Sequence, residues 1–213
     1  MHRLLQGLLA LPHCVGCGVS GIEWCPTCAA VEPDLQWHLL ANTRWSCTAF
    51  PFIDPVRSTI IAWKEHQRAF ARQQVTTWFE GALVPLLDRE VICVPVPSPP
   101  RNDRLRGSRM LLDVLRSIGI PVTDALRSAR PRRDQAGLSR PARYENLRDA
   151  FEWRSHESRP IVIVDDVVTS GATIRAAVDA VRGAGGDVRG AFGLARRGHL
   201  GSVLRADVSL RLS

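Results

Sequence analysis

The sequence lacks a long hydrophobic run. No stretch approaches the roughly 20 apolar residues that a membrane-spanning helix needs, so an integral membrane protein is not expected. The first eleven residues place five leucines at helical spacing, but Gln6 interrupts them and no small-residue cleavage site follows. We therefore expect an amphipathic helix that packs on the body of a soluble, cytoplasmic protein without a membrane span.

Lysine is nearly absent from the chain. Lys64 is the only one, and arginine supplies the other basic side chains. The formal net charge is nevertheless +7 and the pI about 9.8, which predicts an anionic partner such as a nucleotide, a phosphorylated sugar or nucleic acid. With 213 residues, of which 45% are hydrophobic and 23% charged, the chain can bury a core. We expect one main domain with a small appendage.

The cysteines do not suggest disulfides, because no secretion signal precedes them and Cys47 and Cys93 lie apart from the rest. The other four form two CxxC pairs, namely Cys14, Cys17, Cys25 and Cys28. This spacing suits a tetrahedral zinc site with four thiolates, at metal–sulfur distances of about 2.3 Å. An iron–sulfur cluster is the alternative that the spacing leaves open. We expect a structural zinc that holds together a segment too small for its own core.

The rest of the chain alternates predicted strands with predicted helices. Strands are expected at residues 45–52, 91–96, 161–164 and 191–194, and helices from Asp54 onward and at residues 70–87, 108–118 and 171–184. Asp54 is a plausible cap for the first of these helices. Residues 127–148 contain seven arginines and few large apolar residues, which predicts an exposed insertion. The alternation predicts an α/β domain with a mostly parallel twisted sheet flanked by helices on both faces.

The most informative segment runs from Asp165 to Thr173. There a buried strand is followed by two acids and a Thr-Ser-Gly-x-Thr turn that opens a helix. The unpaired N–H groups of such a turn and the helix dipole form an anion site, and the hydroxyls of Thr169, Ser170 and Thr173 can donate to phosphate oxygens. Adjacent strand residues face opposite ways, so Asp165 and Asp166 cannot make the same contact. One of them, or each in turn, can accept hydrogen bonds from ribose hydroxyls.

This run resembles the phosphoribosyl-pyrophosphate motif of type I phosphoribosyltransferases. Nearly the full chain resembles the competence protein ComF family of phosphoribosyltransferase-like proteins. The segments that carry this likeness, besides the four cysteines, are residues 52–68, Val94-Pro-Val-Pro97, Arg106-Gly107, Gln135 with Leu138 and Ser139, Arg143 with Asn146-Leu147, Ala150-Phe151 and Leu194-Ala-Arg196. The chain departs from the family pattern at Ser108-Arg109-Met110, where Phe-Asn-Gln is usual, and at Phe52-Ile-Asp54, where Tyr-x-Gly is usual.

The resemblance implies a type I phosphoribosyltransferase fold over residues 45–213, after a helix and zinc segment at residues 1–44. It implies binding of phosphoribosyl pyrophosphate with Mg²⁺, and phosphoribosyl transfer to or from an unidentified acceptor, which is glycosyltransferase chemistry. Asp165 and Asp166 would be catalytic. The phosphate loop would comprise Val167, Val168, Thr169, Ser170, Gly171, Ala172 and Thr173, and the pyrophosphate side Lys64, Arg101, Arg104, Arg106 and Gly107. The three arginines follow a buried strand whose end lies at the sheet edge of Asp165.

The family is linked to DNA uptake, and this leaves a second class of function open. The chain would then be a non-catalytic module that binds single-stranded DNA, or DNA-uptake proteins, and retains the fold. The basic residues 130–148 would contact DNA phosphates, and Trp37, Trp45, Trp63 and Trp78 would be candidates for stacking on bases. In an enzyme, the same basic segment would close over the site as a lid. A homodimer is a further expectation.

Overall fold

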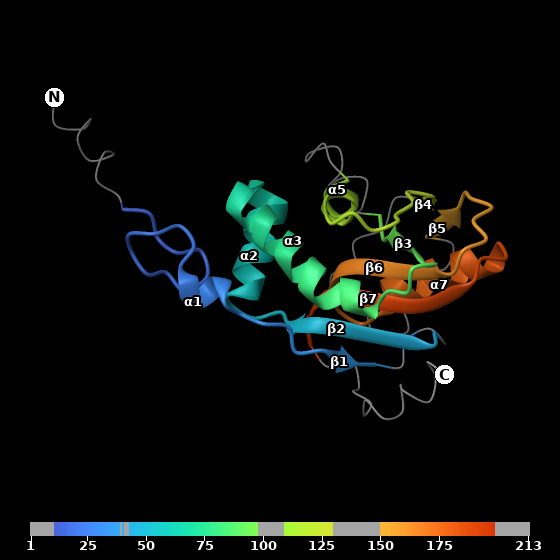
Figure 1. The fold of residues 1–213 in the computed structure, drawn as a ribbon, viewed down its shortest axis with the longest axis horizontal. Coiled ribbons are helices and arrows are strands. Elements are labelled where there is room, and N and C mark those ends of the chain that lie inside the picture. The colour runs from blue at the N-terminus through green and yellow to red at the C-terminus, as the bar shows by residue number, and fades with distance from the viewer. Residues whose placement is uncertain (1–10, 39, 41–42, 98–108, 130–149, 199–213) are drawn as a thin grey trace.

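A five-stranded sheet lies at the centre of the computed structural model, which describes residues 11–38, 40, 43–97, 109–129 and 150–198. The strand order is β1-β2-β7-β6-β3 (Figure 1). The parallel strands are β2 (Trp45–Pro51), β7 (Val188–Arg196), β6 (Ile161–Val168) and β3 (Ile92–Pro95), and β1 (Gln36–Trp37) pairs antiparallel with β2. The predicted α/β architecture with a mostly parallel sheet is confirmed.

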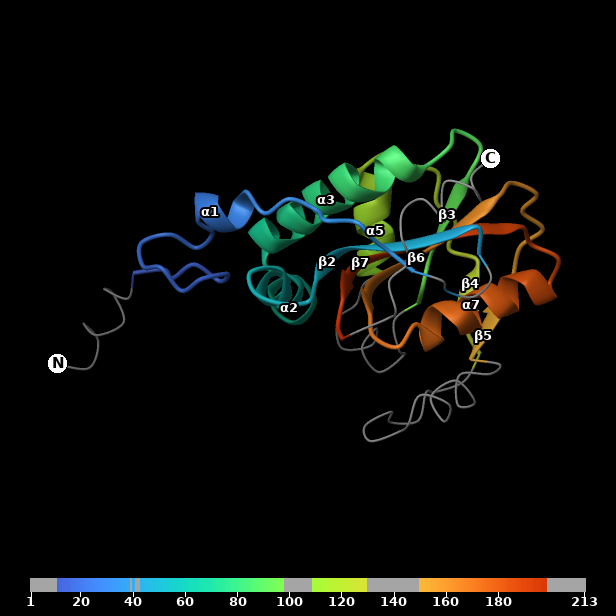
Figure 2. The ribbon, with the colours of Figure 1, turned by 90° about the horizontal axis from the view of Figure 1, so that it is seen from below.

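Helices cover both faces of the sheet (Figure 2). They are α2 (Val56–His66), α3 (Ala69–Leu83) with the 3-10 turn η1 (Val84–Leu86), α5 (Met110–Ser117) and α7 (Ala172–Gly183). α2, α3 and α5 share a buried cluster with Val162 and Val164 of β6. In contrast, α7 packs over Ile161 and Ile163 on the other face of the sheet. None of the helices in the described ranges has the length and apolar content needed to cross a membrane.

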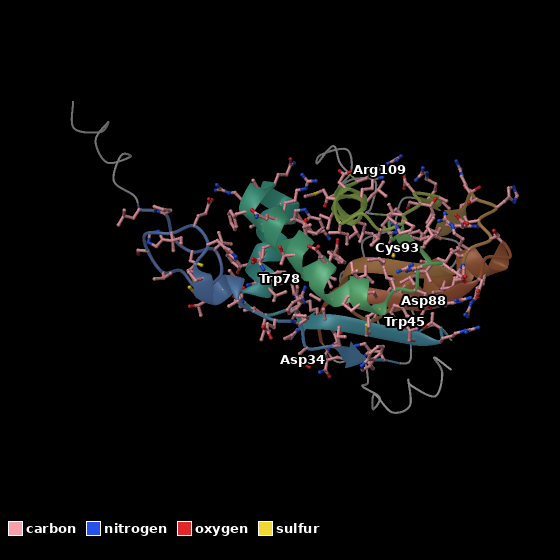
Figure 3. All side chains as sticks on the ribbon, in the orientation of Figure 1. Asp34, Trp45, Trp78, Asp88, Cys93 and Arg109 are labelled. Atoms are coloured by element: carbon pink, nitrogen blue, oxygen red, sulfur yellow. The ribbon has the colours of Figure 1, made fainter. Side chains whose placement is uncertain are left out.

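The local sequence explains why these elements form. The parallel strands are buried on both faces, and β3 and the first half of β6 are accordingly apolar at every position. In α7, Ile174, Ala177, Val178 and Val181 recur at helical spacing, and all four are buried. Trp45 and Trp78, labelled in Figure 3, are also buried, at 7% and 3% exposed. Both tryptophans therefore belong to the core.

The connections predict a ligand-binding edge at the carboxyl ends of β3 and β6. β3 is followed by α5 on one face of the sheet, and β6 is followed by α7 on the opposite face. Neighbouring strands whose helices diverge in this way form a switch point, where open α/β sheets bind ligands. The segment that the sequence singled out, Asp165 to Thr173, lies at this point.

Two boundaries next to the candidate site differ from the prediction. β6 does not end at residue 164 but runs through both acids to Val168, because Asp165 still pairs with Gly193 and Val168 with Arg196 of β7. Asp54 is not the N-cap of α2, since Pro55 occupies that position. The Asp54 carboxylate nevertheless accepts a hydrogen bond from the Ser58 backbone N–H, at 3.2 Å, so it stabilises the first turn from one residue further out.

A second, two-stranded sheet was not predicted. It pairs β4 (Leu126–Ser128) antiparallel with β5 (Phe151–Trp153), and Leu126, Phe151 and Trp153 are buried with α7. The arginine-rich insertion was predicted from residue 127, but its first two residues belong to β4, and residues 130–149 lie outside the described residues. These strands are short, and alternation over three residues is too weak a signal to recognise.

The border between the two predicted domains, at residue 44, stays a prediction. β1 precedes that border and already pairs with the main sheet, through Gln36 with Thr48 and Trp37 with Cys47. The helix α1 (Pro26–Ala29) lies in the cysteine segment ahead of it. The Asp34 N–H also donates to Ala49 O of β2, at 2.9 Å, so the chain joins the main sheet about ten residues before that border.

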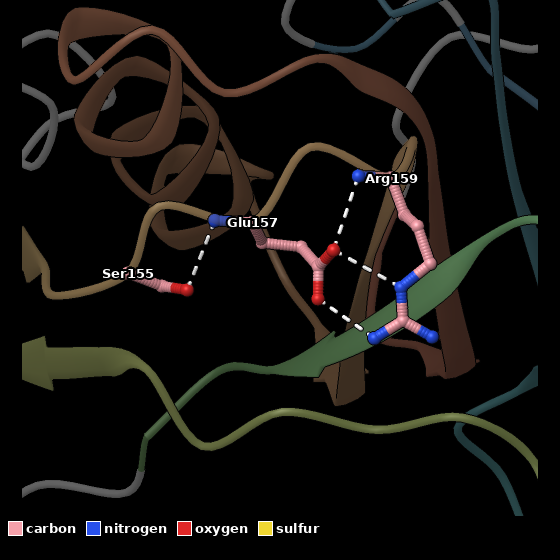
Figure 4. Close-up of polar contacts among 3 residues, drawn as sticks. All are labelled: Ser155, Glu157 and Arg159. Carbon is pink, nitrogen blue, oxygen red and sulfur yellow. Dashed lines mark hydrogen bonds and ion pairs between the residues drawn. The ribbon is translucent and has the colours of Figure 1, made fainter.

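A tight turn leads the chain into β6 (Figure 4). The Arg159 side chain donates through Nε and Nη2 to the two carboxylate oxygens of Glu157, at 3.0 and 2.7 Å, and the Arg159 backbone N–H donates at 3.1 Å. The Glu157 N–H donates to the Ser155 hydroxyl. The hydrogen bonds from the Arg159 side chain and then its backbone, partly opposed by burial, lower the pKa of Glu157 to about 2.

The Glu157–Arg159 contact should make a small, pH-dependent contribution to stability. The Glu157 carboxyl has a pKa of about 2 in the folded chain, against about 4.3 in an unfolded chain. The contribution is therefore complete above pH 4.3 and is lost as the pH falls toward 2. We expect Glu157→Gln to reduce the free energy of unfolding by about 0.5–1 kcal/mol at pH 7 and by less at pH 3, measured by urea denaturation. A difference that grows at pH 3 would contradict this account.

Candidate functional site

The two acids of β6 point to opposite faces of the sheet. Asp166 faces α2, where its carboxylate Oδ2 lies 2.6 Å from Nζ of Lys64. Asp165 is half-buried, and its Oδ1 accepts a hydrogen bond of 2.9 Å from the Asp166 backbone N–H. The expectation that neighbouring acids make different contacts therefore agrees with the geometry.

The Lys64–Asp166 ion pair joins two distant parts of the chain at the ligand-binding edge. Asp166 is only 7% exposed, and the Lys64 side chain is 27% exposed. Lys64 extends from α2, whose Ile60 and Trp63 are 1% exposed and fix the helix against the sheet. A carboxylate this deeply buried needs a counter-charge, because removing one partner of a buried pair leaves an uncompensated charge. Lys64 was predicted to contact phosphate, and the structure places its ammonium on a carboxylate at the same edge.

The turn after β6 has the shape that the sequence indicated. Gly171 has φ +74° and is the N-cap of α7, a conformation that L side chains adopt only at a cost. A side chain here would also meet Leu40, since a Cβ on Gly171 would stand 2.8 Å from Leu40 Cδ2. The first N–H groups of a helix have no intrahelical acceptor, and they carry the positive end of the helix dipole. The N–H of Ala172 lies 3.4 Å from the Ser170 hydroxyl, inside this turn.

The neighbouring strand holds this turn on the sheet. Val168 packs over Gly193 of β7, where an added Cβ would come within 2.3 Å of Val168 Cγ2. The N–H of Arg197 donates to the carbonyl oxygen of Val168, at 2.9 Å, and the N–H of Phe52 donates to Arg196 O, at 2.8 Å. The carboxyl ends of β2, β7 and β6 are therefore tied to one another.

Sequence reasoning missed one exposed cation at this edge. Arg197 directly follows β7 and is exposed, next to the end of β6 to which its backbone is bonded. The available signal was its position just after an apolar strand that ends at the same edge as β6. Four residues predicted for the pyrophosphate side, Arg101, Arg104, Arg106 and Gly107, lie outside the described residues, as does the predicted lid at residues 130–148.

The four cysteines of the N-terminal segment come together as predicted. Their sulfur atoms all lie within 4.8 Å of one another, and Cys17 Sγ is 3.6 Å from Cys25 Sγ. A tetrahedral zinc with bonds of about 2.3 Å requires sulfur–sulfur distances of about 3.8 Å. The set of four thiols and its dimensions fit a structural metal such as zinc.

Backbone hydrogen bonds favour a thiolate in this cluster. Burial opposes ionisation of Cys14, but hydrogen bonds from the backbone of Cys25, Cys17 and Gly16 outweigh it and lower the pKa of the Cys14 thiol to about 6. Metal-binding cysteines must be deprotonated, and Cys14 suits this role, whereas burial and the neighbouring thiols raise the pKa of Cys28. In contrast, burial raises the pKa of both Cys47 and Cys93 to about 12. Those two are unreactive core residues.

The cysteine segment packs against α3 and the start of α2. Trp24 stacks on Phe70 and donates through Nε1 to the Gln74 side chain, at 3.0 Å. Gly16 packs so closely that an added Cβ would lie 2.6 Å from Pro55 Cβ and 2.7 Å from Cys28 Sγ. Pro55 is the N-cap of α2, the helix that carries Lys64. The cluster therefore supports one end of the helix whose other end reaches the acid pair.

Comparison with known proteins gives a limited result. No family model matches the chain, and no curated protein matches it. Among solved structures the chain is similar to the Leishmania donovani UMP synthase, with a TM-score of 0.40 and 16% identity. The match covers 68% of this chain and 25% of the other, so the chain spans about a quarter of that protein. The class that the structure itself defines is a mixed α/β fold with a four-cysteine cluster, and membership of the ComF family stays a prediction.

Two features favour glycine at residue 171, namely its positive φ and the close approach of Leu40, and a double-mutant cycle should separate them. Gly119 has the same φ of +74° but an open surrounding, so Gly119→Ala measures the backbone cost alone, about 1–2 kcal/mol. We expect Gly171→Ala to cost about 1 kcal/mol more, because Leu40 must move, and we expect this excess to vanish in a Leu40→Ala background. Chemical denaturation measures the stabilities of the wild type and of these variants, and equal costs at residues 171 and 119 would refute the Leu40 contact.

Metal analysis tests the cysteine cluster. The purified chain should contain about one zinc, and Cys25→Ser should lose it. Cys93→Ala removes a buried cysteine outside the cluster and should keep the metal, so it is the matched control. Chelation should lower the melting temperature by roughly 4–8 °C, which corresponds to about 2 kcal/mol in a chain of this size. A chain that is free of metal when purified under reducing conditions and melts unchanged would rule out the site.

Proposed function

We propose that this chain is a phosphoribosyltransferase-like protein that binds phosphoribosyl pyrophosphate with Mg²⁺ at the carboxyl edge of its sheet. The proposal further assigns it transfer of a phosphoribosyl group to or from a nitrogenous acceptor. The observation that carries it is the order of parts on β6 and α7: two diverging acids, then a short hydroxyl-rich turn, then a glycine-capped helix. That order provides a carboxylate and a phosphate-sized anion site within one short segment.

The parts of the site have separate roles in this proposal. The turn N–H groups and the hydroxyls of Thr169, Ser170 and Thr173 hold the sugar's terminal phosphate, with the rest of the loop (Val167, Val168, Gly171 and Ala172) shaping the turn. Asp165 accepts hydrogen bonds from ribose hydroxyls. Its carboxylate is half-buried and, by strand alternation, belongs to the face of the sheet opposite Asp166, which α7 covers. Asp166 is held by Lys64 and fixes the position of the strand end beside it.

The chemistry needs cations at the leaving group. In the forward direction, the bond from the ribose C1 to the pyrophosphate oxygen breaks and the electron pair leaves with pyrophosphate. A bond forms from the acceptor nitrogen to C1, and that nitrogen then loses its proton. Charge develops on the pyrophosphate in the transition state, so preorganised cations there accelerate the reaction. Arg197 is an exposed cation at this edge, and Arg101, Arg104 and Arg106 remain predicted contributors. Mg²⁺, when bound, neutralises pyrophosphate oxygens and keeps several waters.

The alternative of a single-stranded DNA module finds no support in the described residues. Base stacking requires exposed aromatic rings, but Trp37, Trp45, Trp63 and Trp78 are buried, at 8%, 7%, 1% and 3% exposed. Their predicted use in stacking is therefore wrong. Contacts with DNA through residues 130–148, with DNA-uptake proteins, or with a second copy in a homodimer stay predictions.

Calorimetry with isosteric variants tests the proposed ligand. Phosphoribosyl pyrophosphate should bind the wild type only when Mg²⁺ is present. Asp165→Asn keeps the Lys64–Asp166 pair but loses a charged acceptor, and should weaken binding roughly tenfold or more. The double variant Asp165→Asn/Asp166→Asn should lose binding. Glu157→Gln, which alters the turn before β6 at the opposite end of the strand, is the control and should bind as the wild type does. Equal binding by the folded double variant would falsify the assignment.

A further inference from the structure

The chain places its only lysine beside its most deeply buried described carboxylate. Arginine supplies every other basic side chain, yet the residue on Asp166 is Lys64. A guanidinium is broad and planar and needs room for several acceptors, whereas an ammonium is a compact point charge. The Asp166 carboxylate is 7% exposed, and the ammonium contacts it through a single Nζ–Oδ2 distance of 2.6 Å, as a point charge does. The choice of residue type therefore matches the geometry of this contact.

Packing contacts fix the position of α2, the helix that bears Lys64, relative to Asp166. Ile60 and Trp63 anchor α2 in the core, and Gln67, at φ +49°, ends the helix just beyond Lys64. Pro55, at the start of the helix, is pinned under Gly16 of the cysteine segment. The Lys64 ammonium thus reaches Asp166 from a helix that is packed at its start and along its buried face.

We propose that Lys64 occupies the cation position of Asp166 and so prevents this carboxylate from binding a divalent metal directly. Carboxylate oxygens at a sheet edge are the ligands that Mg²⁺ and Mn²⁺ prefer. With the ammonium in place, a divalent ion enters the site only as a complex with the anionic ligand. Lys64 is therefore a positioning and selectivity residue, in place of the phosphate contact predicted from the sequence. The inference rests on the proposed function only for the identity of that ligand.

Binding of Mn²⁺ alone, followed by the loss of the free-ion signal in electron paramagnetic resonance, tests this directly. Lys64→Met has a similar length without the charge. It should bind Mn²⁺ roughly tenfold or more tightly than the wild type, because the metal can then contact the Asp166 carboxylate in place of the ammonium. Lys64→Arg keeps a positive charge and should not gain this binding. The double variant Lys64→Met/Asp166→Asn should return to the wild-type level, which also accounts for Mn²⁺ bound elsewhere on the chain.

Two results would overturn the proposal. The first is a folded Lys64→Met, checked by circular dichroism, that binds Mn²⁺ no more tightly than the wild type. The second result comes from proteins that both keep Lys64. If the wild type binds Mn²⁺ measurably more tightly than Asp166→Asn does, the ammonium does not exclude the metal. This comparison keeps the test decisive if Lys64→Met does not fold.

The same variants separate this inference from the proposed function. A gain of Mn²⁺ binding in Lys64→Met, in a protein whose wild type never binds phosphoribosyl pyrophosphate, would support the role of Lys64 and reject the ligand. Binding of phosphoribosyl pyrophosphate by the wild type, without a gain of Mn²⁺ binding in Lys64→Met, would support the ligand and reject the role of Lys64.

Discussion

The ion pair between Lys64 and Asp166 is the contact that the ligand-binding edge depends on. β6 is buried on both faces, so a carboxylate near its end must be exposed, protonated or paired. The pair gives the Asp166 carboxylate a counter-charge beneath α2, and it fixes the end of β6 against that helix. The strand end in turn sets where Asp165 and the following turn lie. A charge interaction between sequence-distant elements thus positions the whole segment from Asp165 to Gly171.

The cysteine segment packs on the same helices that position Lys64. It has no core large enough to fold alone, and a metal would hold its two CxxC turns together. Its packing against Trp78 and Phe70 of α3, and of Gly16 against Pro55, supports α3 and the start of α2. The segment makes no described contact with Asp165 or the turn. Its described contacts are with α3 and with the start of α2, the helix that carries Lys64.

Sequence reasoning recovered what depends on local pattern. The apolar runs predicted β2, β3, β6 and β7, helical spacing predicted α2, α3, α5 and α7, and paired CxxC turns predicted the sulfur cluster. It did not recover β1, β4 or β5, because two- and three-residue strands have no usable periodicity. The partner of Asp166 and the packing of Leu40 on Gly171 were also beyond reach. Both contacts depend on which elements the sheet topology brings together, which composition and spacing do not encode.

The distribution of charge at this edge explains how one short segment can hold a ligand with both phosphates and hydroxyls. If both acids were free, their charge would repel a phosphate approaching the turn beside them. Lys64 neutralises one acid from the α2 face, while the amide dipoles of the turn and α7 attract anions on the other face. Asp165 lies on that other face, away from the side on which Lys64 contacts Asp166. Separating the two acids onto opposite faces of one strand is what makes an anion site compatible with adjacent carboxylates.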